Sequence, residues 1–151
     1  MFIRQPAFTD DNKMLKGALH CHTTRSDGDV APDEVIRLHK ANGFDFIALT
    51  DHRIYNYRNF AEDVDITIIP GMEFDNTFVR DNGFRTYHTV FIGPDDDTNG
   101  YAQDEELDRG TAVDQVGFQK YLDDAHRKNN LTIYCHPQWS STPTRYFDKL
   151  K

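Results

Sequence analysis

A histidine pair and an acid lie close together near the start of the chain. His20 and His22 follow an apolar run at 17–19, and Asp27 lies in a Ser-Asp-Gly-Asp stretch. Residues two apart on an extended strand project to the same face, so both imidazoles can offer a nitrogen to one metal ion. Asp and Gly favour a tight turn, which leaves the Asp27 carboxylate near the strand end. A polar strand end with two unrelated histidines explains the pair alone equally well.

Other candidate ligands stand beside other apolar runs. His52 follows the run 44–49, Glu73 follows 66–69, His136 follows 131–135, and His88 lies at or near the start of 87–93. Parallel sheets and α/β barrels gather their functional groups at the C-terminal ends of strands. The recurrence of histidine at successive strand ends is stronger evidence than any single pair, and it predicts a functional site at one rim of the fold.

Short strands and helices must position these side chains. Apolar and β-branched runs predict strands at 16–19, 44–49, 66–69, 87–93 and 131–135. We expect a helix that begins near Pro32, in a stretch with two acids, and stops at Gly43. A second helix is expected over 114–129. Strands that alternate with helices predict an α/β barrel-like or parallel-sheet domain.

Length and composition set broad limits. A chain of 151 residues is expected to form one domain, 1–151, with a single core. No apolar stretch is long enough to span a bilayer, and the N-terminus has no apolar segment of signal-peptide length, so we expect a cytoplasmic protein. Cys21 and Cys135 are too few for a disulfide framework. We expect both to be buried, reduced thiols and leave a metal-ligand role open.

Negative charge is concentrated in one segment. Residues 95–108 contain seven acids and no Lys or Arg, and the formal net charge of the chain is −8. No basic stripe is available to track long nucleic acid, which argues for a small or short substrate.

The same acidic segment fits the EF-hand formula, with Asp95, Asp97, Asn99 and Glu106 at ligand positions for calcium. A predicted strand precedes the segment and no convincing helix follows it. An acidic solvated loop is therefore the favoured interpretation, and calcium binding is the alternative.

The spaced motifs resemble the PHP (polymerase and histidinol phosphatase) family of metal-dependent phosphoesterases. The matching segments run from about residue 16 to 139 in the order of the family: His20-Cys21-His22-Thr23 with Ser26-Asp27-Gly28, Leu49-Thr50-Asp51-His52, Gly71-Met72-Glu73, His88 ahead of Gly93, and His136-Pro137. The resemblance implies a distorted (β/α)7 barrel whose strand ends hold two or three divalent metal ions. It assigns His20, His22 and Glu73 to one ion, Glu73, His88 and His136 to a second, and Asp27 and His52 to a third.

One motif of the family is missing from the sequence. The family closes its site with an Asp-x-His near the C-terminus, whereas Asp148 is followed by Lys149 and Leu150. The first ion would lack a carboxylate and the third an imidazole, so the second site is expected to be the best preserved. We expect a fragment or a shortened relative with a barrel that is incomplete at the C-terminus. An oligomer partner or a missing C-terminal segment would then cover its exposed edges.

The ligand types set the expected chemistry. Imidazole and carboxylate suit zinc, manganese or iron and do not select among them. Clustered ions lower the pKa of a shared water, so that hydroxide can attack phosphorus in line at neutral pH. Besides the bridging Glu73, we predict that Arg25 and Arg53 bind phosphate and that Asp51 orients a neighbouring ligand. Ordinary surface arginines and a turn acid are the alternatives. Trp139 and Arg145 follow His136 and could line a pocket.

These observations favour a metal-dependent phosphoesterase. Its substrate would be a phosphomonoester or phosphodiester of a small metabolite, a nucleotide or a short oligonucleotide. The first alternative is a non-catalytic metal-binding or interaction domain, which the missing Asp-x-His favours. The second is a polymerase-associated exonuclease module, against which the lack of a polymerase sequence and of a basic surface counts.

Overall fold

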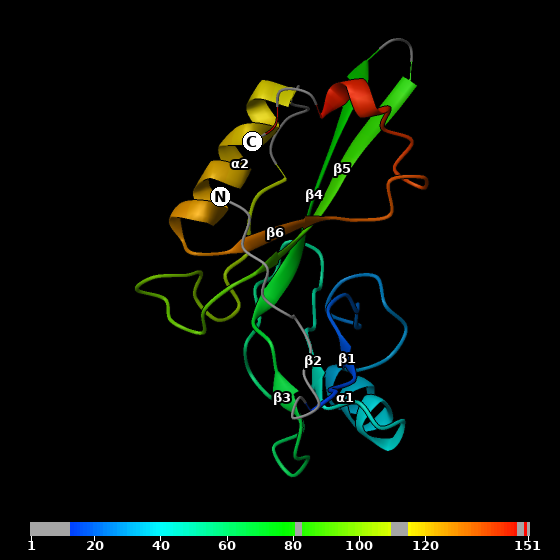
Figure 1. Ribbon diagram of the computed structural model, residues 1–151, viewed down its shortest axis with the longest axis vertical. Helices are drawn as coiled ribbons and strands as arrows, with labels where there is room; N and C mark the ends of the chain where they lie inside the picture. The colour runs from blue at the N-terminus through cyan, green and yellow to red at the C-terminus, as the bar shows by residue number, and fades with distance from the viewer. Residues whose placement is uncertain (1–12, 81–82, 110–114, 148–149, 151) are drawn as a thin grey trace.

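A small parallel sheet forms one end of the molecule in the computed structural model, which describes residues 13–80, 83–109, 115–147 and 150 (Figure 1). Its strands are β1 (Gly17–Ala18), β2 (Phe46–Ile47) and β3 (Thr67–Ile68), and they pair in that order. Helix α1 (Pro32–Ala41) packs Val35 and Ile36 against Ile47. This end therefore has the β-α-β connection that the sequence predicts.

The ends of helix α1 follow from its sequence. Pro32 occupies the first turn, where its missing N–H costs no hydrogen bond, and Asp33 and Glu34 lie at the positive end of the helix dipole. The helix ends at Asn42, and Gly43 follows with φ of 78°. This left-handed conformation is one that glycine adopts without strain. The predicted start and stop of this helix are confirmed.

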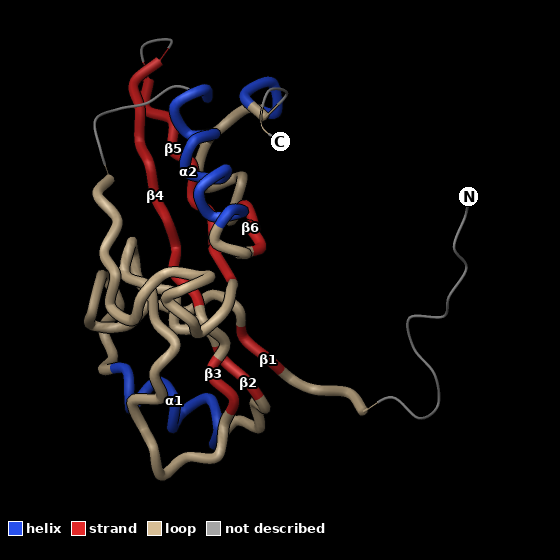
Figure 2. The backbone as a smooth tube through the Cα atoms, turned by 90° about the vertical axis from the view of Figure 1, so that its left-hand side faces the viewer, coloured by secondary structure: helices blue, strands red, loops and turns tan. Residues whose placement is uncertain are grey.

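A second sheet, antiparallel throughout, forms the other end. It consists of β4 (Gly71–Arg80), β5 (Gly83–Ile92) and β6 (Leu131–Tyr134), in that order. Helix α2 (Gln115–Arg127) lies alongside, as Figures 1 and 2 show, and a 3₁₀ turn, η1 (Thr144–Tyr146), follows β6. The rings of Phe118 and Tyr87 stack with centroids 4.4 Å apart, which fixes α2 against β5.

The two sheets meet where β4 begins. His52, which follows β2, forms an isolated parallel bridge with Glu73, and Asn56 forms an antiparallel bridge with Gly71. The Arg53 N–H donates to the Glu73 carbonyl at 2.8 Å. These backbone contacts hold the segment after β2 against β4, and they set the place where the predicted ligands gather.

The prediction of one parallel sheet, with Glu73 just after the strand at 66–69 and His88 at or near the start of 87–93, is wrong for the second half of the chain. Glu73 lies inside β4, and His88 is the sixth residue of β5, a strand of 10 residues. The reason is that β4 and β5 pair as a long hairpin, which the short apolar runs do not reveal. The described residues form two α-helices and six strands, fewer elements than a complete (β/α)7 barrel has.

Some predictions fall outside the described residues. These include the first residue of the helix expected at 114–129, the N-terminal segment 1–12, and Asp148. Within the described part of the chain, neither helix is long and apolar enough to cross a membrane.

Candidate metal centre

The carboxylate of Glu73 lies at the centre of a histidine cluster, and its side chain is only 1% exposed. Five histidine nitrogens lie within 3.4 Å of its oxygens: His20 Nε2 (3.4 Å), His22 Nε2 (2.9 Å), His52 Nδ1 (3.3 Å), His88 Nδ1 (3.0 Å) and His136 Nε2 (3.1 Å). Six of the seven residues assigned to metal ions are thus in direct contact around one buried acid.

The alternation of side chains along β4 points the Glu73 side chain toward the histidine cluster. Met72 and Phe74 point to the aromatic core, so Glu73 and Asp75 point to the opposite face. The register pairs Asp75 with His88 on the neighbouring strand β5, which brings the His88 imidazole beside Glu73. The hairpin therefore contributes a buried polar face with two acids and one histidine.

The loop after β1 supplies the first histidine pair. His20 Nε2 lies 3.0 Å from His22 Nε2, as their two-residue spacing predicts, although both residues follow the strand. Asp27, the seventh predicted ligand, accepts a hydrogen bond from His22 Nδ1 at 2.7 Å, and its other oxygen lies 3.5 Å from His52 Nε2. All seven predicted ligands are therefore brought together.

Asp51 holds this loop in place. It is fully buried and accepts hydrogen bonds from the Thr23 N–H (2.7 Å), the Thr23 hydroxyl (2.9 Å) and the Ser26 hydroxyl (2.9 Å). Its contacts are thus with the loop that carries His22 and Asp27 rather than with a ligand imidazole.

The acid and its histidines shift one another's pKa values. Hydrogen bonds to Cys135 and to Glu73 raise the pKa of His20 to about 9. The hydrogen bond to Glu73, with a further one to Asp27, raises the pKa of His22 to about 9. Burial raises the pKa of Glu73, but the hydrogen bonds from His20, His22 and His88 outweigh burial and hold it well below its ordinary value.

The donor set fits divalent metal ions. Three groups of side chains each bring their ligand atoms within 4.8 Å of one another: His20 with Glu73, Cys135 and His136; His22 with Asp27 and His52; and His52 with Glu73 and His88. The buried atoms Glu73 Oε2 and His52 Nδ1 face one another at 3.3 Å, and His22 Nε2 lies 2.9 Å from the same oxygen. Lone pairs of buried imidazole and carboxylate groups that face one another can be satisfied by a shared cation. The grouping differs from the predicted one and adds Cys135.

Two neighbouring cavities open on the cluster. One, of about 360 Å³, is lined by His22, Asp27, His52, Glu73, His88, His136 and Trp139. The other, of about 470 Å³, shares Asp27, His52, His88 and Trp139 with the first and is also lined by three arginines: Arg25, Arg53 and Arg109. Trp139 is 68% exposed and packs edge-on against His88 and His136, which places its ring beside both cavities.

Buried Asp75 anchors two of the arginines. Its carboxylate contacts Arg53 and Arg109, and His52 Nδ1 lies 3.2 Å away. Burial raises the pKa of Asp75, but the hydrogen bond from His52 and the charges of the arginines outweigh burial and keep it below its ordinary value. Arg25, which also lines this cavity, forms an ion pair with Asp104. Both predicted arginines therefore line the cavity beside the cluster.

Sequence reasoning missed Asp75 and Arg109, and it left a metal-ligand role for Cys135 open. Asp75 could have been found from its alternation with Glu73 along a strand, whereas Arg109 carries no motif that marks it. In the predicted calcium loop, the Asp96 carboxylate accepts bonds from Thr98 and Asn99, and within 83–109 the segment is preceded by β5 rather than by a helix.

Comparison with known proteins decides the family. The model of the PHP domain matches residues 18–149. The chain belongs to the PHP domain family. No match was found among curated proteins.

Two solved structures are similar to parts of this PHP domain. A provisionally assigned metal-dependent phosphoesterase from Bifidobacterium adolescentis is 25% identical over 53% of this chain, with a TM-score of 0.43. An amidohydrolase from Chromobacterium violaceum, with bound sulfate and no metal, is 30% identical over 52% of this chain, with a TM-score of 0.41. The chain covers 28% of the length of each of these proteins.

Proposed function

We propose that this PHP domain hydrolyses phosphoesters with the help of two or three divalent ions held by the histidine cluster. The observation that supports the proposal is the approach of five histidine nitrogens to the Glu73 carboxylate, within 3.4 Å. A buried acid surrounded by imidazoles is a donor set for zinc, iron or manganese. Family membership supports the same interpretation. The proposal includes one domain, residues 1–151, related to the distorted (β/α)7 barrel.

The ions would supply Lewis acidity and a water deprotonated at neutral pH. Residues of the chain would bind and orient the ester. Arg53 and Arg109 line the cavity beside the cluster, where guanidinium groups can bind two phosphate oxygens at once. Asp75 holds both guanidiniums, and Asp51 holds the loop of His22, so the phosphate and the ligands keep a fixed relative position.

The proposed substrate is a phosphomonoester or phosphodiester of small size, such as a metabolite, a nucleotide or a short oligonucleotide. The combined size of the two cavities and the local arginines supports a small anionic ligand. An exonuclease module would need a basic track for the strand, whereas the formal net charge of this chain is −8.

Hydrolysis of p-nitrophenyl phosphate and bis(p-nitrophenyl) phosphate with added manganese tests the proposal. His22→Ala removes a nitrogen 2.9 Å from Glu73 and should lower turnover by at least about tenfold. His126→Ala is the matched control. Among the described residues, His126 contacts Thr132 and belongs to none of the donor groups, so this substitution should leave turnover unchanged. Equal turnover in the wild-type and His22→Ala proteins would favour the non-catalytic metal-binding alternative.

A further inference from the structure

We propose that Cys135 is a thiolate ligand of one ion in this centre, in a donor set with His20, Glu73 and His136. The thiolate makes this position selective for a borderline-soft ion such as zinc over manganese. This inference rests on the metal binding that the proposed function assumes, but it does not depend on hydrolysis.

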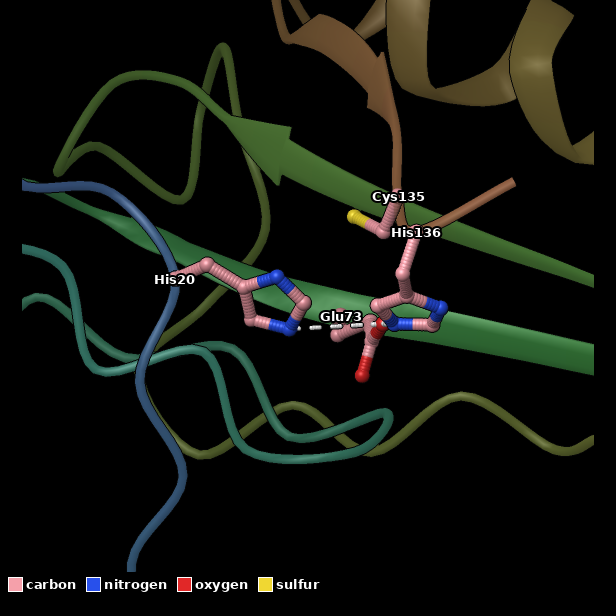
Figure 3. A group of neighbouring side chains, drawn as sticks. All are labelled: His20, Glu73, Cys135 and His136. Carbon is pink, nitrogen blue, oxygen red and sulfur yellow. Dashed lines mark hydrogen bonds and ion pairs between the residues drawn. The ribbon is translucent and has the colours of Figure 1, made fainter. Parts of the chain in front are cut away.

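The four donors converge from three distant segments. The Cys135 sulfur lies within 4.8 Å of a ligand atom of each of the other three residues. Figure 3 shows the sulfur on the side of Cys135 that faces the His20 ring, with Glu73 and His136 next to it. The rings of His20 and His136 stack at a centroid distance of 5.6 Å. Cys135 is 6% exposed, so its sulfur is inside the cluster rather than on the surface.

The backbone after β6 makes this convergence possible. Neighbouring residues on a regular strand point to opposite faces, so Cys135 and His136 should diverge. His136 instead has φ of 28°, a conformation that non-glycine residues rarely adopt. The Cys135 N–H donates to the His88 carbonyl at 2.8 Å, which fixes Cys135 against β5. Both side chains of the pair thus face the same acid.

The carboxylate that the set shares is a second observation. Glu73 is 1% exposed, and its Oε1 lies 3.4 Å from His20 Nε2 and 3.1 Å from His136 Nε2, so one oxygen of a buried acid faces both imidazoles of the set. Buried lone pairs that converge in this way are satisfied by a shared cation or proton. The Cys135 thiol donates to the Ile133 carbonyl at 3.3 Å, and this proton is displaced when a metal binds.

The chemistry of the set selects the ion. Thiolate sulfur favours zinc, copper(I) and iron, whereas manganese prefers carboxylate, carbonyl and water oxygens. Two imidazoles, one carboxylate and one thiolate form a four-donor set of the kind that binds zinc tetrahedrally. The other two groups of donors, around His52, contain no sulfur.

Cys21 provides the matched comparison within the same chain. It lies between His20 and His22 in sequence, but its thiol donates toward the His22 carbonyl at 3.8 Å, and it packs against the apolar core of the parallel sheet. It belongs to none of the donor groups among the described residues. A serine at position 21 should therefore leave metal binding intact.

The test adds cobalt(II) to the chelator-treated full chain and records absorption. We expect a near-ultraviolet thiolate-to-cobalt charge-transfer band in the wild-type protein and in Cys21→Ser. The band should be lost in Cys135→Ser, while visible d–d bands remain in all three proteins. Competition titrations should show zinc bound at least about tenfold more weakly by Cys135→Ser, with manganese affinity changed by less than about twofold. Far-ultraviolet circular dichroism checks that each variant is folded.

Visible cobalt bands without the charge-transfer band in the wild-type protein would overturn the role of Cys135 and leave the proposed metal centre standing. Loss of the band in Cys21→Ser but not in Cys135→Ser would overturn it as well. A failure of the wild-type protein to bind cobalt would overturn both proposals. The presence or absence of the charge-transfer band in the wild-type spectrum tests the role of Cys135 even if Cys135→Ser does not fold.

Discussion

The clearest consequence of the cluster is a pH-dependent stability of the metal-free protein that depends on Glu73. The pKa values of His20 and His22 are raised from 6.5 to about 9 in the folded protein. Their protonated forms therefore contribute stability that is fully present below pH 6.5 and is lost as the pH rises to about 9. The lowered pKa of Glu73 arises from the same hydrogen bonds with His20 and His22, so it is not counted as a second contribution to stability.

The size of the effect follows from linkage and exposure. A rise from 6.5 to about 9 would correspond to about 3 kcal/mol for each imidazole without screening. The side chain of His20 is 32% exposed and that of His22 is 21% exposed, and both share one carboxylate. Screening by solvent therefore reduces the combined contribution to about 2–3 kcal/mol.

Urea unfolding in the presence of a chelator measures this contribution at pH 6.5, 7.5 and 9. The wild-type free energy of unfolding should fall by about 2–3 kcal/mol over this range. Glu73→Gln removes the charge that raises both pKa values, so its free energy of unfolding should be lower at pH 6.5 and nearly flat to pH 9. Glu34→Gln, on the exposed face of α1, should keep the wild-type slope. A wild-type stability that stays level or rises between pH 6.5 and 9 would refute this reasoning.

Three further predictions concern the surroundings of the cluster. Arg109→Gln should raise the KM for a phosphoester by about 10- to 100-fold, because it removes one charge-assisted hydrogen bond to the phosphate. The affinity for zinc, measured in a competition titration, should be unchanged. Asp51→Asn places an amide group against the Thr23 and Ser26 donors, which should cost about 1–3 kcal/mol in thermal or urea unfolding. Added calcium should leave the Tm unchanged, because a strand, β5, precedes the 95–106 segment where an EF-hand has a helix. A clear rise in Tm would support the EF-hand interpretation.

Local signals in the sequence predicted the parts of the fold that depend on neighbouring residues. The start of α1 at Pro32 and its stop at Gly43 follow from helix-end chemistry, and the contact of His20 with His22 follows from their spacing. The motifs that resemble the PHP family identified the seven residues that the structure brings together. These predictions required no knowledge of contacts between distant segments.

Contacts between distant segments explain what the sequence could not predict. Glu73 and His88 lie inside strands because β4 and β5 pair over their whole length, and a short apolar run does not reveal the length of its partner. The sequence left a metal-ligand role for Cys135 open but could not predict the positive φ of His136, which accompanies the convergence of both side chains on Glu73. Arg109 and Asp75 are far apart in the sequence and come into contact only in the folded chain.

Anomalous X-ray diffraction from crystals of the metal-loaded protein locates ions by element and so tests whether Glu73 is the centre of a metal site. We predict anomalous peaks at about 2.0–2.2 Å from the Glu73 carboxylate and from nitrogens of the surrounding histidines. Peaks that lie elsewhere on the protein, with none beside Glu73, would rule out the proposed metal centre.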